Sequence, residues 1–381
     1  MKKIKKYIER KESILTGKAK LSRLYKFKDF PVFMGCVDEK PEKDIVADMI
    51  WNICKDTGVI QLGKLLPLDI LYLNNHNDGI GKVWQDHYAA FAKFLSKFSP
   101  KYILEIGGAH DHIAKYFRQY DQEVDWTTVE PNPEYIKDPK IRVIKDWFSD
   151  KFTYKGKVDT IIHSHVFEHM YDPFDFMRSI NKFLKIGDKQ IFSFPNMLPM
   201  LKNNYTNCLN FEHTVFMPEA IAEYIIKKNG FKILDKEYYG DPHSIFYATE
   251  KVSDPIDTLK LPKNYTLYKK VFMSYIKYHE KMVSNLNKLI KKSDAPVYLF
   301  GAHIFSQTLI QFGLNADKIV SVLDNSPIKQ GKRLYGTLLN VESPKALKGK
   351  GKINLILKAG IYNDEIKKDI LENINSEVVF W

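Results

Sequence analysis

The stretch YILEIGG, residues 102–108, decides the fold of this 381-residue chain. It reads as a short apolar strand that ends in Glu105 and a glycine turn, and a helical pattern follows at once. Further along, TTVEP, residues 127–131, reads as a second apolar strand that ends in the carboxylate of Glu130. A glycine turn at the end of a strand lets a ligand approach the backbone, and a carboxylate at the tip of the next strand can accept both hydroxyls of a ribose. The pattern therefore predicts a site for an adenosine-containing cofactor, either a nucleotide or S-adenosylmethionine.

Strands and helices alternate around this stretch. Such alternation predicts a mainly parallel sheet with helices on both faces, an α/β fold in which the ligand lies at the carboxyl ends of the strands. Helices are expected at residues 82–97, 112–119, 173–185 and 218–229. Strands are expected at residues 102–106, 126–130, 141–144, 158–163, 189–194, 231–237 and 244–249.

The length of the chain favours two or three domains. Residues 1–75 read as largely irregular and predict a small N-terminal lobe, and residues 76–252 hold the central domain. In residues 253–381 a polar linker with two prolines and a long helix lead into a second alternation, which repeats the order strand, glycine, helix, strand, acid. This order predicts a second Rossmann-like domain. The segments behind these predictions are a strand at 58–62, the linker at 253–264, the helix at 265–292, and strands at 297–300, 319–323 and 353–357.

The composition narrows the function classes. A net charge of +12 fits phosphate-bearing substrates, an acidic membrane or nucleic acid, and it equally fits a lysine-rich chain with no special partner. No nucleic-acid-binding module is recognisable. No apolar run is long enough to span a bilayer and the basic N-terminus lacks the apolar core of a signal peptide, so we expect a cytoplasmic protein without a membrane partner. The three cysteines, Cys36, Cys54 and Cys208, form no C-x-x-C pair, which disfavours a disulfide framework or a four-cysteine zinc site.

The glycine turn itself predicts how the cofactor is held. We expect the cofactor to meet Gly107 and Gly108, with Glu105 orienting the turn and the methionine end of the cofactor, and Glu130 with Pro131 at the ribose. The turn lacks the later glycine of G-x-G-x-x-G, and the second turn is incomplete too, which disfavours an NAD-dependent enzyme. A structural turn without a ligand is the plain alternative.

The loop after the third strand offers a second contact to the cofactor. The carboxylate of Asp146 can accept a hydrogen bond from the adenine amino group, and the indole of Trp147 can cover the ring. The alternative is a surface loop with a packed tryptophan.

The segment HSHVFEHMYDP, residues 163–173, lies at the end of the fourth strand. Here the chain resembles the class I S-adenosylmethionine-dependent methyltransferases, in which such a segment walls the cofactor pocket. The resemblance implies a Rossmann-like fold of this class for the central domain. His163, Ser164 and His165 are placed to face the cofactor, whereas the following Glu-His pair fits a helix start. Zinc binding by the three histidines of the segment is an alternative, but no dedicated ligand spacing supports it.

The loop NFEH, residues 210–213, holds the best catalytic candidate. His213 can take a proton near neutral pH, and the adjacent Glu212 can orient its imidazole or raise its basicity. His243 could bring a second polar group to the same pocket. The plain alternative is that each histidine is a satisfied loop residue.

The chain as a whole resembles the sugar C-methyltransferase family, whose members act on nucleotide-linked keto-sugars. The family has a small zinc-binding N-terminal lobe, a central methyltransferase domain and a Rossmann-like C-terminal domain. In the central part, the resemblance lies in residues 105–107, 129–131 and 211–213, the last similar to the family's Y-H-E-H loop with its proposed base. In the C-terminal part it lies in residues 300–302, 323–337 and 364–366, which are similar to the family's Y-G-A, D-x-x-P-x-K-Q-G and D-E-I motifs.

Several positions depart from the family pattern. Thr57 stands where the family has the partner of Cys54, and the other cysteine pair is absent, so we expect no metal in the N-terminal lobe and a lobe held by its own core. Asn210 and Phe211 replace the tyrosine and first histidine of the Y-H-E-H loop, and residues 241–244, DPHS, replace an H-G-G-S motif. These changes lie on the substrate side.

Together, the residues and the resemblance predict an S-adenosylmethionine-dependent methyltransferase that acts on a small molecule. The expected substrate is a sugar, in particular a nucleotide-linked one of the kind used in polysaccharide biosynthesis, methylated on carbon or oxygen with His213 as general base. The alternative of another class is a catalytically silent module that binds a sugar nucleotide.

Overall fold

The computed structural model of the chain describes residues 1–4, 6–71, 81–133, 136–240, 242–256 and 258–381. They form two compact units, and each unit draws on separate stretches of the sequence. The first unit comprises Met1–His76, Met200–Glu212 and Tyr265–Trp381, and the second comprises Asn77–Pro199 and His213–Asn264. The predicted boundary between residues 75 and 76 lies outside the described residues. The division into three domains is finer than these two units and stays a prediction.

The second unit is built around a seven-stranded sheet. Its strands are β8 (Tyr102–Ile106), β9 (Asp125–Val129), β10 (Ile141–Ile144), β11 (Thr160–Ser164), β12 (Lys189–Pro195), β14 (Phe231–Tyr239) and β15 (Ser244–Lys251). Their order is β10-β9-β8-β11-β12-β15-β14. The strands from β10 to β12 are parallel, and β15 is antiparallel to both of its neighbours. The predicted mainly parallel α/β sheet is confirmed.

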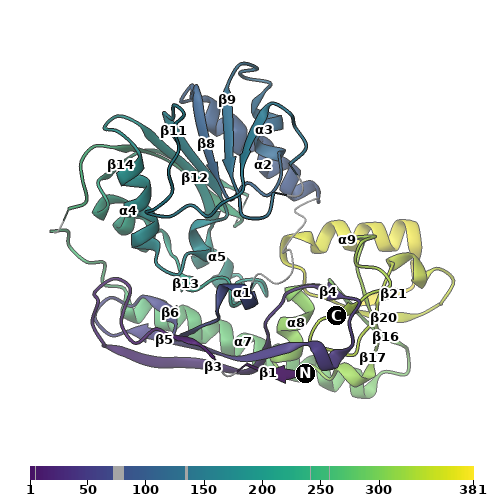
Figure 1. Ribbon diagram of the computed structural model, residues 1–381. Coiled ribbons are helices and arrows are strands. Elements are labelled where there is room, and N and C mark those ends of the chain that lie inside the picture. The colour runs from purple at the N-terminus through teal and green to yellow at the C-terminus, as the bar shows by residue number, and fades with distance from the viewer. Residues whose placement is uncertain (5, 72–80, 134–135, 241, 257) are drawn as a thin grey trace. The chain divides into compact units, whose positions relative to one another are not determined.

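Helices cover both faces of this sheet (Figure 1). Successive side chains of a strand point to opposite faces. On one face Ile103, Ile162 and Phe246 pack against helices that precede and follow β8. On the other face His163 contacts Phe176 of the helix that follows β11. The helices of this unit and the stretch that follows it are α2 (Lys82–Ser96), α3 (His112–Phe117), α4 (Pro173–Phe183), α5 (Met197–Lys202) and α6 (Glu219–Lys228), with a short strand β13 (Val215–Phe216).

The N-terminal part of the first unit is a β-structure, so the prediction of a largely irregular lobe is wrong. Two long antiparallel strands dominate it, and two register shifts interrupt their pairing. Such irregularities break the alternation by which a strand is recognised in sequence. Its elements are β1 (Lys2–Lys3), β2 (Ile8–Glu9), β3 (Leu21–Pro31), β4 (Cys36–Val37), β5 (Ile45–Cys54), β6 (Ile60–Leu62), β7 (Lys64–Leu65) and α1 (Leu68–Leu71).

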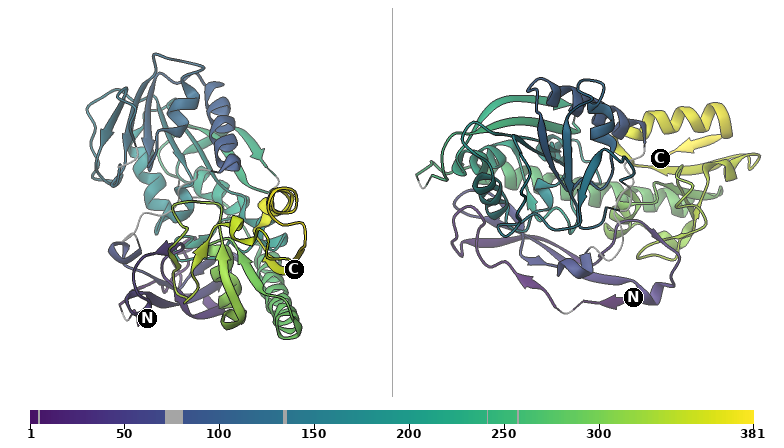
Figure 2. Two further views of the ribbon diagram at one scale, coloured as in Figure 1. Left: turned by 90° about the vertical axis from the view of Figure 1, so that its right-hand side faces the viewer. Right: turned by 45° about the horizontal axis from the view of Figure 1, so that its top comes forward.

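The C-terminal part of the first unit holds the second parallel sheet that the sequence predicts. Its order is β19-β17-β16-β20-β21, and all four strand pairs are parallel. The long helix α7 lies beside β3 and β5 (Figure 1; Figure 2), where the rings of Trp51 and Phe272 have centroids 6.0 Å apart. The elements are α7 (Tyr265–Lys292), β16 (Val297–Phe300), α8 (Ile304–Gln311), β17 (Ile319–Leu323), β18 (Arg333–Leu334), β19 (Val341–Glu342), β20 (Ile353–Leu357), α9 (Asn363–Asp369) and β21 (Val378–Phe380).

The N-terminal strands are fastened to this C-terminal part, which corrects the expectation that the lobe is held by its own core alone. The buried guanidinium of Arg333 donates to both oxygens of Asp44, each at 2.7 Å. Strand β18 pairs antiparallel with β4, and Gly336 N donates to Asp44 at 2.8 Å. A buried bidentate pair of this kind fixes geometry as well as charge. No helix among the described residues is both long and apolar enough to cross a bilayer.

Candidate functional site

The strand order of the second unit reverses at β8, because β9 lies on one side of it and β11 on the other. In open parallel sheets, ligands bind outside the carboxyl ends of the strands at such a reversal. The residues that follow β8, β9 and β11 are therefore the first candidates for a site, and they include the glycine turn, Glu130 and Ser164.

The glycine turn after β8 has no room for side chains. Gly107 has a φ of +72°, and its N–H donates to Val129 O at 3.0 Å. A Cβ on Gly107 would lie 2.7 Å from a methyl carbon of Val166, and one on Gly108 would lie 2.5 Å from the carboxyl carbon of Glu105. The backbone of the turn is thus packed between the end of β11 and the carboxylate of Glu105, which leaves its outer side as the surface that a ligand can approach.

Glu105 is a buried acid beneath this turn. Trp126 Nε1 donates to it at 2.8 Å and the Thr128 hydroxyl donates to the same oxygen at 3.1 Å. Burial raises the pKa of Glu105 to about 7, against these two hydrogen bonds, which lower it. Its contact with Gly108 fits a role in shaping the turn, and its predicted role at the methionine end of the cofactor stays a prediction.

Glu130 lies where β9 ends, and only 8% of its surface is exposed. One carboxylate oxygen accepts the N–H of Asn132 at 2.8 Å. The other has no hydrogen-bond partner within the described part of the chain, and burial raises the pKa of the group. A half-satisfied carboxylate at this strand end can accept hydrogen bonds from a diol. Pro131 follows it and is partly buried.

Asp146 and Trp147 lie in an exposed loop after β10, the strand that pairs with β9. The Asp146 carboxylate accepts the N–H of Trp147 at 2.7 Å, and Trp147 is 55% exposed. The loop is at the same edge of the sheet as Glu130, whose N–H donates to Ile144 O at 3.0 Å. Their predicted contact with adenine stays a prediction.

Ser164 ends β11 at the reversal, and His165 follows it. The Ser164 and Ser193 hydroxyls lie 2.8 Å apart, and His165 N donates to Ser193 O at 2.9 Å. His165 has a φ of +54°, a region that residues other than glycine adopt sparingly. Its ring Nε2 lies 2.9 Å from the Ser244 hydroxyl, so the turn directs the imidazole along the carboxyl edge of the sheet.

His163 points to the other face of the sheet. It is fully buried, stacks on Phe192 with centroids 4.7 Å apart, and its Nε2 lies 2.8 Å from Gln190 Nε2. Burial lowers its pKa to about 3. The three histidines of residues 163–169 therefore do not converge, which removes both the predicted place of His163 beside the cofactor and the alternative of a zinc site made from these three.

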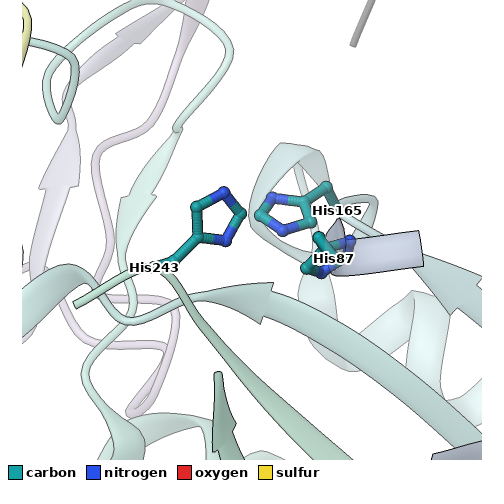
Figure 3. Close-up of side chains that lie close together, drawn as sticks. All are labelled: His87, His165 and His243. Atoms are coloured by element: carbon teal, nitrogen blue, oxygen red, sulfur yellow. The ribbon is translucent and has the colours of Figure 1, made fainter. Parts of the chain in front are cut away.

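Two other groups do converge at this edge, and each joins residues distant in sequence. In the first, His87 of α2, His165 and His243 each bring one ring nitrogen within 4.8 Å of the others (Figure 3). In the second, Glu168, His169 and His213 do the same. No pattern in the sequence marks His87, and the Glu168-His169 pair fits a helix start there.

A chain of polar contacts links the group of His87, His165 and His243 to the group of Glu168, His169 and His213. His243 Nδ1 lies 2.6 Å from the Ser244 hydroxyl, which also contacts His165. Glu168 Oε1 lies 3.2 Å from His165 Nδ1 and 3.8 Å from His169 Nε2. The predicted catalytic histidines thus lie at opposite ends of this polar chain. Burial lowers the pKa values of His165 and His243 to about 3, so both imidazoles are neutral at physiological pH.

Glu212 precedes His213 in the loop. Its N–H donates to the side-chain oxygen of Asn210 at 2.9 Å. The carboxylate that the structure brings beside His213 is Glu168, which is only 1% exposed. Its sequence signal was weaker than that of Glu130, because Glu168 lies four residues beyond the end of β11 whereas Glu130 directly follows β9.

Two family models match the chain. One is described as a methyltransferase domain and matches residues 80–236, which contain the glycine turn and the sheet edge described above. This fold and its reversal site define a class I S-adenosylmethionine-dependent methyltransferase, and S-adenosylmethionine is its methyl donor. The second model, described as a C-methyltransferase C-terminal domain, matches residues 259–377. With both matches the chain belongs to the S-adenosylmethionine-dependent C-methyltransferase family, as the resemblance of its motifs predicted.

Solved structures of methyltransferases are similar to part of the chain. The 1,6-didemethyltoxoflavin-N1-methyltransferase of Burkholderia thailandensis, solved with its substrate and S-adenosylhomocysteine, shares 14% identity over 45% of this chain and 82% of its own, with a TM-score of 0.36. An S-adenosylmethionine-dependent methyltransferase of Mesorhizobium loti shares 11% over 44% of this chain and 99% of its own, with a TM-score of 0.35. The plantazolicin methyltransferase BpumL shares 11% over 45% and 84%, with a TM-score of 0.35. No curated protein matches the sequence.

Proposed function

We propose that the protein transfers a methyl group from S-adenosylmethionine to a carbon of a nucleotide-linked sugar, with His213 as the general base. The observation that carries the catalytic part is the meeting of Glu168, His169 and His213 at the carboxyl edge of the sheet, each with one side-chain atom within 4.8 Å of the others. This group lies next to Ser164 and His165, which follow the strand at the reversal.

The cofactor is assigned to the glycine turn and Glu130. The outer side of the turn receives the methionine part, because its other side is packed against Val166 and Glu105. The unsatisfied oxygen of Glu130 accepts the ribose hydroxyls, with Asp146 and Trp147 at the adenine. The sulfonium of the cofactor supplies an electrophilic methyl group, so the main task of the protein is to align donor and acceptor.

His213 removes the proton from the acceptor atom. An imidazole beside a carboxylate is more basic, since the carboxylate stabilises the imidazolium that forms. Glu168 suits this role because it is an almost fully buried acid within reach of both His169 and His213. At a carbon next to a ketone, the C–H bond electrons would pass to the oxygen as an enolate. That carbon would then bond to the methyl group as the methyl–sulfur bond breaks and its electron pair stays on sulfur, which leaves S-adenosylhomocysteine. Glu212 and His243 are assigned to orienting the base and to the substrate side of the edge.

The substrate class rests on the C-terminal part of the chain. The match to a C-methyltransferase C-terminal domain favours a carbon acceptor over oxygen. The resemblance of residues 300–302 and 323–337 to a family that acts on nucleotide-linked keto-sugars favours that class of substrate. A net charge of +12 suits a ligand that carries phosphates.

The test uses the full chain with methyl-labelled S-adenosylmethionine and a set of nucleotide-linked keto-sugars. We expect a labelled product whose NMR spectrum shows the methyl group on carbon at the position next to the ketone. Transfer to a hydroxyl would replace the carbon acceptor with oxygen. Failure of every nucleotide-linked sugar, with intact binding of the methyl donor, would contradict the substrate class.

A second experiment isolates the base. His213→Gln should lower kcat by roughly 10²- to 10⁴-fold, because general-base catalysis contributes about that much, while calorimetry shows unchanged affinity for S-adenosylmethionine. His112→Gln is the matched control, since His112 begins α3, stacks on Tyr88 and is not part of the group formed by Glu168, His169 and His213. Unchanged turnover of His213→Gln would reject it as the base.

A further inference from the structure

Three histidines from three separate elements meet at the carboxyl edge of the central sheet. His87 comes from the middle of α2, His165 from the turn after β11, and His243 from the residue before β15. Figure 3 shows the three rings facing one another. One ring nitrogen from each lies within 4.8 Å of the other two.

The ring nitrogens of His87 are buried without hydrogen-bond partners in the described part of the chain. It is 0% exposed, and neither of its ring nitrogens has a hydrogen-bond partner among the described residues. Leaving a buried polar group unsatisfied is unfavourable, so native proteins rarely do so without a ligand or an ordered water. The ring is held in place by aromatic neighbours, with Phe91 stacked below it and Phe246 at its edge.

The other two histidines have outer partners of the kind that metal ligands have. Glu168 Oε1 lies 3.2 Å from Nδ1 of His165, and the Ser244 hydroxyl lies 2.6 Å from Nδ1 of His243. Histidines that bind a metal usually donate their second ring N–H to a carboxylate or another acceptor, which fixes the tautomer and the ring orientation. The positive φ of His165, +54°, also aims its ring at the cluster at a cost in backbone energy, and such costs gather at functional sites.

The spacing of the rings matches a metal centre. Imidazoles that bind a tetrahedral zinc ion at 2.0–2.1 Å place their ring centroids about 5 Å apart. The centroids of His87 and His165 are 5.2 Å apart, those of His87 and His243 are also 5.2 Å apart, and those of His165 and His243 are 5.8 Å apart.

We propose that His87, His165 and His243 bind one divalent transition-metal ion of the zinc class. Three imidazole nitrogens suit zinc, copper or nickel, whereas magnesium and calcium require oxygen ligands. Among the described residues Glu168, His169 and His213 form a second group that could hold a metal ion. Its two histidines are only partly buried, whereas His87 in the first group is fully buried. The proposed site lies in a single unit and is independent of which acceptor the enzyme methylates.

The test measures metal binding by the full-length chain without cofactor or substrate. The purified protein is stripped with a chelator, dialysed against zinc alone, and its metal content is measured by mass spectrometry. We expect one zinc per chain, and we expect cobalt in its place to give the visible absorption of a tetrahedral site. His87→Phe keeps a ring between Phe91 and Phe246 and should lose the ion. His243→Gln, at a less buried position, should lose it as well, and Glu168→Gln should weaken binding roughly 10- to 100-fold.

Two controls decide whether the ion sits in this cluster. His112→Gln and His213→Gln should each retain one zinc. Equal zinc content in the original chain, His87→Phe and His243→Gln would overturn the proposal, as would the absence of bound zinc in excess metal. Loss of zinc in His213→Gln with retention in His243→Gln would move the ion to the other group and also overturn it.

Discussion

The two parallel sheets of the molecule end in the same turn but use it differently. In the central sheet Gly107 N donates to Val129 O at 3.0 Å, and in the C-terminal sheet Gly301 N donates to Leu323 O at 2.8 Å. Each turn is followed by a helix, and each second strand ends in an acid, Glu130 or Asp324.

The difference lies in what the acid binds. Both oxygens of Asp324 are engaged by its own domain, because one accepts Ala302 N at 2.9 Å and Lys329 Nζ at 3.2 Å and the other accepts Ser326 N at 2.9 Å. Glu130 keeps one oxygen without a partner in the described part of the chain. The same order of residues in sequence therefore occurs at two different turns. At one the acid is fully hydrogen-bonded within its own domain, and at the other the acid keeps an oxygen that can bind a ligand.

The largest expected contrast concerns the two glycines. Gly107→Ala should lower the free energy of unfolding by about 4 kcal/mol, because the strain of a left-handed alanine adds to a clash with Val166. Gly301→Ala should cost about 2 kcal/mol, since its φ is +98° but its nearest neighbour would lie 3.4 Å away. Urea unfolding followed by tryptophan fluorescence measures both. Equal losses would show that the two turns are equally crowded.

The next contrast is a pH dependence that only the central sheet carries, since Leu299 occupies the place of Glu105 in the C-terminal sheet. Burial raises the pKa of Glu105 to about 7 from its ordinary 4.5, so the folded state holds the proton more tightly than the unfolded chain. Stability from this group is present below pH 4.5 and is lost as the pH rises to 7, by on the order of 3 kcal/mol. Glu105→Gln should remove this part of the decline, measured as unfolding free energy against pH. A variant with the same decline as the original chain would contradict the assignment.

The open acid should control cofactor binding. Glu130→Ala should weaken S-adenosylmethionine by roughly 10- to 100-fold, which corresponds to about 1.5–3 kcal/mol for hydrogen bonds to a charged group. Isothermal titration calorimetry gives the dissociation constant, and Asp324→Ala is the matched control with unchanged affinity. If the two variants bind the cofactor equally well, the central turn is not the adenosine site.

The closed acid should control only stability. Asp324→Asn should lower the free energy of unfolding by about 1 kcal/mol, because an amide offers one acceptor where the carboxylate serves three donors. Thermal unfolding with and without S-adenosylmethionine checks this, and the rise in melting temperature caused by the cofactor should be the same as in the original chain. A smaller rise would mean that the C-terminal turn also takes part in cofactor binding.

The parallel sheets were predictable because their strands are buried on both faces. Such strands are nearly continuous apolar runs, and those at 102–106, 297–300 and 353–357 have the bounds that the sequence predicts. The strands at 141–144 and 319–323 also have the predicted bounds, although Val143 and Val320 are exposed. The helix Tyr265–Lys292 also agrees, because its apolar residues repeat at helical spacing over many turns.

The N-terminal strands were not predictable by the same signal. In β3 the exposed lysines Lys26 and Lys28 alternate with buried or half-buried residues, but register shifts after Arg23 and Phe27 interrupt the period. Lysine and aspartate are also unfavourable in strands on average. Strand β3 forms because it pairs with β5, and such a pairing between distant segments cannot be recognised from the local sequence pattern.

The site was predictable only where strand ends bring residues together. Glu105, Glu130 and Ser164 lie at or next to the carboxyl ends of parallel strands, so their chain positions alone place them at one edge. His87 carries no such signal, because it lies in α2 among Phe91 and Phe94 at helical spacing and resembles a core residue. Its meeting with His165 and His243 depends on how α2 packs against the sheet, which only the fold reveals.

The ion pair between Asp44 and Arg333 has a consequence for how the chain is made. The two residues are 289 positions apart, yet they join the N-terminal strands to the C-terminal part of the chain. Domains generally fold as units in the order of synthesis, and contacts between distant residues form late. The long N-terminal strands can pair with one another early, because β3, β5 and β6 all precede the central sheet in the sequence. Asp44, in contrast, gains its partner Arg333 only near the end of translation, after the whole methyltransferase sheet has been made.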